Sequence, residues 1–177
     1  MKFLTLSERE IRTPQIYNQI REPHIVISIS GSEDEETQIP NNSSRLGKLH
    51  LKFDDIEDIR EDYTYYDMGC AEESLNFLER FCTKISLVVV QCQAGLSRSV
   101  GLASALSKII NGMDDDVFTK GIPNMFVYTT TLEYFFGNPN WASDYPKIST
   151  VRNKMLSQFL TPAQIRLYSA KNRKRVQ

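Results

Sequence analysis

The amino-acid sequence predicts an α/β fold in which a mostly parallel central sheet is flanked by helices, giving three αβα layers. Short runs rich in β-branched residues alternate along the chain with segments of helical periodicity, the arrangement that produces βαβ units. The run 85–90 is almost continuously apolar, as expected of a strand that is buried on both faces. The chain has 177 residues, of which 41% are apolar and 24% charged, so we expect one domain over residues 1–177.

Four strands are expected, each bounded by turn-forming or charged residues. They cover residues 2–6, 24–30, 48–53 and 85–90. The second is β-branched and lies between Pro23 and Gly31. The third alternates polar and apolar residues, which predicts one solvated face.

The expected helices follow from apolar periodicity and from cap residues. Ser7 and Glu10 have the capping-box spacing, which predicts a brief helical turn. Longer helices are predicted over 72–84, from 98 or 99 to about 111 with Gly112 as its stop, over 124–136 after Pro123, and over 147–160. Asp114–Asp116 is predicted to be an acidic connector, 138–146 a loop and Pro162 a break.

An acidic run lies in the segment 31–47, which is rich in Ser, Asn and Pro. It comprises Glu33, Asp34, Glu35 and Glu36. Such a run predicts a solvated loop, and a role in repelling or sorting acidic substrates is the alternative.

The segment that carries the chemistry follows the predicted fourth strand. It begins at Cys92 and includes Arg98, with five residues between the two. A loop between a strand and a helix N-terminus gathers backbone N–H groups, and these with the helix dipole favour an anion. The same field favours the thiolate form of a cysteine at its centre. The guanidinium of Arg98 can bind two phosphate oxygens at once, so this segment could both hold a phosphoryl group and attack it.

This segment resembles the signature loop of the cysteine-dependent protein tyrosine phosphatases, His-Cys-x-x-Gly-x-x-Arg-Ser/Thr. It is most similar to the compact dual-specificity branch and its bacterial and phage relatives, which Pro123-Asn124-x-x-Val127-Tyr128 also resembles. The resemblance implies a phosphatase-like fold, with Cys92 as nucleophile, Arg98 binding phosphate and Ser99 assisting departure of the sulfur. It implies a phosphate-binding loop formed by Gln93, Ala94, Gly95, Leu96, Ser97 and Arg98. Gln91 stands where the family has histidine.

A general acid is expected on another loop, because the leaving oxygen needs a proton. In the compact phosphatases this residue is an aspartate after the preceding strand, and that resemblance points to Asp55. Asp54 and Asp58 are the alternatives.

These observations lead to a phosphatase that hydrolyses phosphomonoesters on protein, phosphotyrosine and also phosphoserine or phosphothreonine, through a phosphocysteine. Two alternatives stay open: an RNA 5′-phosphatase or nucleotide phosphatase with the same loop, and a phosphate-binding module without turnover, which Gln91 motivates.

Composition and residue spacing predict the cellular compartment, the cofactors and the binding partners. Three sparse cysteines and the absence of a long apolar stretch predict a cytoplasmic protein with no membrane partner. His24 and His50 lack ligand spacing and are expected at the surface or the sheet edge, so we expect neither a metal nor another cofactor. We expect a phosphorylated protein as the partner. A basic segment from about residue 166 leaves nucleic-acid binding as an alternative.

Overall fold

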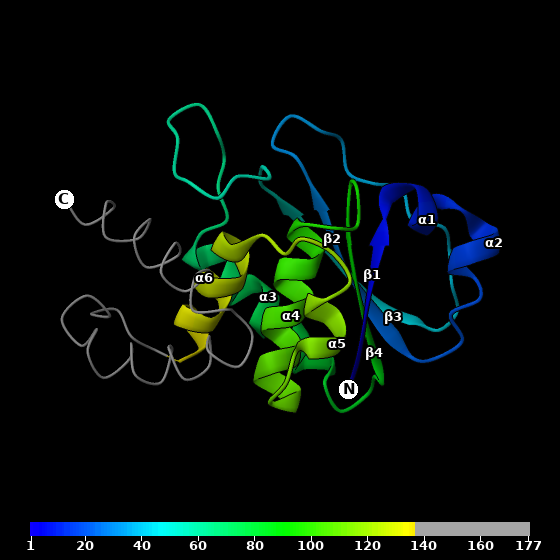
Figure 1. Ribbon diagram of the computed structural model, residues 1–177. Coiled ribbons are helices and arrows are strands. Elements are labelled where there is room, and N and C mark those ends of the chain that lie inside the picture. Colours follow the sequence, from blue (N-terminus) through cyan, green and yellow to red (C-terminus); the bar gives the residue numbers. More distant parts are fainter. Residues whose placement is uncertain (137–177) are drawn as a thin grey trace. The chain divides into compact units, whose positions relative to one another are not determined.

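Four parallel strands form the centre of the computed structural model, which describes residues 1–136 of the chain (Figure 1). They are β1 (Lys2–Ser7), β2 (His24–Ser30), β3 (Arg45–Lys52) and β4 (Leu87–Cys92). Their order across the sheet is β1-β4-β2-β3, and every neighbouring pair is parallel. The predicted fold class, a parallel sheet flanked by helices, is confirmed.

The burial of each strand matches its position in the sheet. All residues of β2 and β4, the two inner strands, are buried, which explains their apolar sequences. The edge strand β3 alternates between exposed and buried positions, as predicted. β3 begins at Arg45 rather than at 48, and β4 runs to Cys92 rather than ending at 90. The sequence missed this end because pairing with β1, which places Ser7 opposite Cys92, prolongs the strand.

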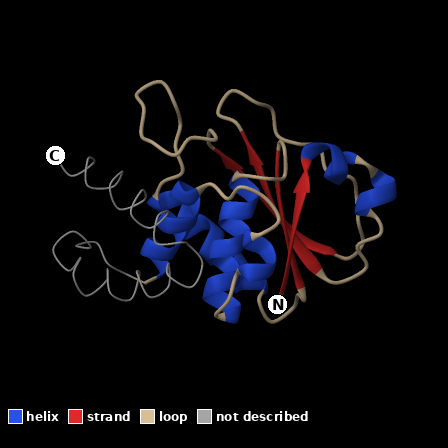
Figure 2. Ribbon diagram, viewed as in Figure 1, coloured by secondary structure: helices blue, strands red, loops and turns tan. Residues whose placement is uncertain are grey.

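Helices cover both faces of the sheet (Figure 2). α1 (Glu8–Arg12) and α2 (Pro14–Tyr17) lie on one face, and α3 (Met68–Phe81), α4 (Arg98–Asn111), α5 (Asp115–Phe118) and α6 (Met125–Phe135) lie on the other. Successive residues of a strand point to opposite faces, so β4 contributes to two apolar clusters. Val88 and Val90 pack in the cluster under α3, α4 and α6, whereas Leu87 and Val89 pack under α1 and α2.

Cap residues account for the helix boundaries. The capping box predicted for α1 is confirmed, because the Glu10 amide donates to the Ser7 hydroxyl at 3.2 Å and the Glu10 carboxylate accepts from the Ser7 amide. α4 begins at Arg98, one of the two predicted starts, and the predicted stop Gly112 ends it at a φ of 75°. The predicted start of α3 at 72 is wrong. That helix begins at Met68, because the Asp67 carboxylate caps it.

The expected acidic connector at 114–116 is also wrong. Asp114 is buried, accepts a hydrogen bond from the Tyr128 hydroxyl at 2.7 Å and lies 3.5 Å from the Lys108 ammonium. It precedes the short helix α5. A buried carboxylate is stable when it is paired and hydrogen-bonded.

His24 is buried rather than at the surface or edge. Its Nδ1 donates to the Glu22 carbonyl at 2.8 Å, so Nε2 accepts from the Tyr17 hydroxyl at 2.9 Å. Burial lowers the pKa of His24 below its ordinary value, since the charged form loses hydration. The imidazole therefore acts as a neutral part of the packing between β2 and α2.

Several predictions fall outside the described residues: the loop 138–146, the helix 147–160, the break at Pro162 and the basic segment from about 166. A single domain over 1–177 therefore stays a prediction. None of the helices within residues 1–136 has the length and apolar character needed to cross a membrane.

Candidate active site

The loop 93–97 joins β4 to α4 at the edge of the sheet where the parallel strands end (Figure 1). Ligand sites of open α/β sheets form at this edge. Cys92 is the last residue of β4, and its side chain is almost fully buried. Its sulfur lies 3.2 Å from the Ser99 hydroxyl oxygen, a hydrogen-bond distance for sulfur. The strand and helix thus bring the two predicted residues together.

The backbone of the loop is held with its carbonyl groups directed outward. Three of them accept amide hydrogen bonds from other segments: Gln93 from Glu8 at 3.1 Å, Leu96 from Ile122 at 2.9 Å, and Ser97 from Asn124 at 3.1 Å. A trans peptide places each C=O opposite to the next N–H, so these contacts turn the amides of Ala94, Ser97 and Arg98 inward. Within residues 1–136, the amides of 94–97 donate to no protein acceptor. They are available to an anion above Cys92.

Gly95 gives the loop its turn. Its φ is +72°, a conformation that other residues rarely adopt, and an added Cβ would lie 2.6 Å from the Ser7 amide nitrogen. Both the backbone conformation and the close approach of β1 therefore require glycine at this position.

Arg98 is the first residue of α4, and its side chain is buried. Its Nη1 donates to the Phe53 carbonyl at 2.8 Å. Its Nε has no hydrogen-bond partner in the described part of the chain and lies 4.0 Å from the nearer Asp55 carboxylate oxygen. A buried guanidinium donor without a partner, next to inward-facing amides, suits a phosphate oxygen.

The two adjacent carboxylates after β3 have different surroundings. Asp55 faces the loop, where its Oδ1 accepts from the Ser97 hydroxyl at 2.8 Å. Asp54 faces away, accepting from the Ser32 amide and hydroxyl and from the Thr64 amide. Asp58 is exposed further along the same segment. Of the three predicted acids, the structure places Asp55 beside the loop.

Asp54 is held in its ionised form. Partial burial alone would raise its pKa, but the hydrogen bonds from Ser32 and Thr64 and the charge of Arg98 together lower the pKa of Asp54 below its ordinary value. A carboxyl that binds its proton less readily is poorly suited to donate one at neutral pH. Its contacts instead join the loop after β2 to the loop after β3.

Replacing Asp54 by asparagine should lower the free energy of unfolding at pH 7 by about 1–2 kcal/mol, because the amide can satisfy fewer of these donors. The folded-state pKa is lowered, so this stabilisation is present above the unfolded value of 3.8 and is lost as pH falls through the folded value. Urea unfolding of both proteins at pH 7 and near pH 3 measures this. A difference that grows on acidification would contradict the assignment.

Asn124 is a site residue to which the sequence assigned no role beyond its place in the Pro123-Asn124-x-x-Val127-Tyr128 resemblance. Its Nδ2 donates to Asp55 Oδ1 at 2.9 Å and to the Ile56 carbonyl at 3.1 Å, and its Oδ1 caps α6 through the Val127 amide at 3.0 Å. Its own amide binds the Ser97 carbonyl. The buried side chain of Asn124 thus holds the segment that contains Asp55 against the loop 93–97. The available signal was an asparagine preceded by proline at a helix start.

Gln91 lies beneath the loop on the opposite face of the sheet from Cys92. It is fully buried, and its Oε1 accepts from the Ser28 hydroxyl at 2.7 Å across the β2–β4 pair. Its Nε2 has no hydrogen-bond partner among the described residues. The side-chain NH2 group of Gln91 is therefore an unused hydrogen-bond donor on this face of the sheet. Because the amide is uncharged, it supplies no positive charge beneath Cys92.

The three cysteines should differ in reactivity. Burial raises the pKa of Cys70 to about 11, which leaves it as an unreactive thiol at neutral pH. Cys92 lies under inward amides and Arg98, which should attract the anionic reagent iodoacetate. We expect mass spectrometry to show alkylation of Cys92 before Cys70, and protection of Cys92 by inorganic phosphate. Equal labelling of both cysteines would contradict an anion-binding loop.

Comparisons with known proteins identify structural neighbours only. No protein-family model and no curated protein matches the sequence. Human DUSP28 has a similar structure, with a TM-score of 0.54 at 14% identity, covering 75% of this chain and 90% of that one. The human tyrosine phosphatase-like serine/threonine/tyrosine-interacting protein gives a TM-score of 0.56 at 18% identity, covering 75% and 89%. At 14% and 18% identity, these likenesses show that this chain shares the fold of the two human proteins, a parallel α/β fold of the protein tyrosine phosphatase-like kind.

Proposed function

We propose that this protein is a phosphatase that hydrolyses phosphomonoesters on protein through a phosphocysteine intermediate. One observation carries the proposal: Cys92 lies beneath a loop whose amides turn inward, beside a buried Arg98 whose Nε has no hydrogen-bond partner within residues 1–136. A nucleophile and an oxyanion site share one centre, which is the arrangement that covalent phosphoryl transfer needs.

In the first step, the Cys92 thiolate attacks phosphorus in line with the leaving oxygen. The S–P bond forms while the P–O bond to the substrate breaks. The amides of 94–97 and the Arg98 guanidinium bind the three equatorial oxygens as negative charge redistributes. The Asp55 carboxyl gives its proton to the leaving oxygen, so the product departs as an alcohol or phenol.

In the second step, water attacks the phosphocysteine and inorganic phosphate leaves. Asp55, now ionised, accepts a proton from that water. The S–P electron pair returns to Cys92, where the Ser99 hydroxyl at 3.2 Å can donate a hydrogen bond to the developing thiolate. Asn124 and Ser97 act as positioning residues, because both bind Asp55 Oδ1 rather than the reacting atoms.

The test is to trap the intermediate. The full chain is mixed with a ³²P-labelled aryl phosphate, quenched in acid within milliseconds and digested, and we expect label on the peptide that contains Cys92. A thiophosphate bond is recognised by its cleavage with iodine, to which phosphoserine is inert. Turnover without label at Cys92 would contradict the covalent mechanism. Phosphate binding without any turnover would show that the fold serves as a binding module.

A further inference from the structure

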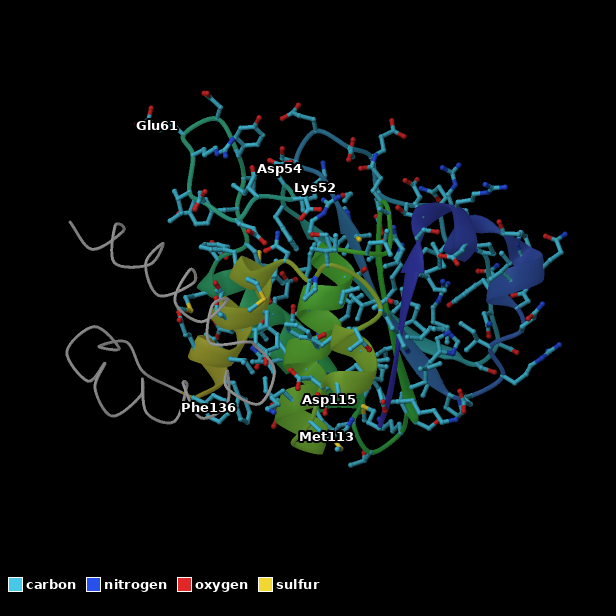
Figure 3. The ribbon with its side chains drawn as sticks, in the orientation of Figure 1. Lys52, Asp54, Glu61, Met113, Asp115 and Phe136 are labelled. Atoms are coloured by element: carbon cyan, nitrogen blue, oxygen red, sulfur yellow. The ribbon has the colours of Figure 1, made fainter. Side chains whose placement is uncertain are left out.

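Two acidic segments lie beside the candidate active site. They are 31–36, which follows β2, and 54–62, which follows β3. Together they contain ten acidic residues and one basic residue, Arg60. The side chains that are exposed include Glu33, Glu35, Glu61 and Asp62. Figure 3 shows Asp54 and Glu61 at the end of the molecule where the strands terminate.

These segments are attached to each other and to the active site through neighbouring residues. Asp54 accepts hydrogen bonds from Ser32 in the first segment and from the Thr64 amide just after the second. The next residue, Asp55, contacts Ser97 of the loop and lies 4.0 Å from Arg98. The negative charge is therefore next to the catalytic centre, and these hydrogen bonds hold it there. We call the segments 31–36 and 54–62 the acidic rim.

The candidate active site beside the acidic rim favours negative charge, whereas the rim favours positive charge. The buried Arg98 Nε without a hydrogen-bond partner among the described residues, and the inward amides of 94–97, attract an anion. A ligand that suits both regions carries one compact anionic group and has positive charge around it. A polyanion suits only the centre, because its other phosphates would lie against the rim.

Resting on the proposed phosphatase activity, we propose that the substrate is a phosphorylated protein segment in which lysine or arginine residues flank the phosphoresidue, and that the acidic rim selects it. The rim concentrates such segments by attraction at the mouth of the site and repels acidic ones. The same field disfavours RNA 5′ ends, whose neighbouring phosphodiesters are all negative.

The test compares two phosphotyrosine peptides of equal length, one with lysine and arginine on both sides of the phosphotyrosine and one with glutamate and aspartate there. With the full chain at an ionic strength of about 0.01 M, we expect kcat/KM to be at least about tenfold higher for the basic peptide. The ratio should fall at about 0.15 M, because the Debye length shortens from about 30 Å to about 8 Å.

A matched pair of variants locates the effect. Glu33→Lys with Glu35→Lys reverses charge on the rim, and we expect it to lower the ratio of the two kcat/KM values several-fold. Asp115→Lys with Asp116→Lys makes the same change in net charge at the opposite end of the molecule, where Figure 3 labels Asp115. This control should leave the peptide ratio and the hydrolysis of a simple aryl phosphate unchanged.

Equal kcat/KM values for both peptides, or the same change of ratio in both double variants, would overturn selection by the rim while the phosphatase function stands. Faster release of phosphate from a 5′-triphosphorylated RNA than from either peptide would also overturn it. Failure of the native protein to hydrolyse even a simple aryl phosphate would instead refute the proposed function itself, and the substrate inference with it.

Discussion

Replacing Cys92 by serine should abolish phosphatase turnover while leaving phosphate binding intact. A serine hydroxyl without an adjacent base is a weak nucleophile, and removing the nucleophile of another covalent enzyme costs on the order of 10⁶ in kcat. The groups that bind phosphate are the amides of 94–97 and Arg98, and neither involves the sulfur.

The measurement pairs hydrolysis of an aryl phosphate with calorimetric titration of inorganic phosphate. Cys92→Ala serves as a second variant, since it removes the hydrogen bond to Ser99 as well as the nucleophile. Thermal unfolding of both variants shows whether β4 still packs. Hydrolysis by the Cys92→Ser variant at a rate near that of the native protein would refute Cys92 as the nucleophile.

Replacing Asp55 by asparagine should lower kcat by about 10²–10⁴ for phosphotyrosine, because no proton is delivered to the leaving oxygen. The effect should be small for an activated aryl phosphate, whose leaving group departs as an anion. The asparagine Oδ1 can still accept from Ser97 and Asn124, so the position of the segment is retained.

The matched control is Asp54→Asn, an identical change at the neighbouring carboxylate that faces Ser32 and Thr64. It should affect stability more than the dependence of kcat on the leaving group. A native-like kcat for phosphotyrosine in the Asp55→Asn variant, with a large loss in an Asp58→Asn variant, would transfer the role of general acid to Asp58.

The sequence predicted the parts of the fold that depend on local pattern. The strand 24–30 was predicted with the boundaries that the structure shows, and the helix that ends at Gly112 was predicted to start within one residue of Arg98, because β-branched runs and a terminal glycine act locally. Boundaries failed where a distant contact or an unrecognised cap decided them. α3 begins one turn earlier than predicted, at Met68, because Asp67 caps it, and β4 extends to Cys92 through its pairing with β1.

Burial of polar residues was the other failure. His24 was expected at the surface or the sheet edge, and Asp114 was expected in an acidic connector. Each is buried because a partner compensates for lost hydration: Tyr128 and Lys108 for Asp114, and Tyr17 for His24. Such partners become neighbours only after the helices pack.

By itself, the sequence determined the fold class and the location of the candidate nucleophile, since both follow from residues that are adjacent along the chain. Strand, cysteine, glycine turn, arginine and helix occur within one continuous segment, 85–111. Only the tertiary structure separated Asp55 from Asp54, because consecutive side chains take different directions and their partners come from distant loops. It likewise revealed Asn124, which reaches Asp55 across 69 positions of sequence, and it brought two acidic segments to the same edge of the sheet.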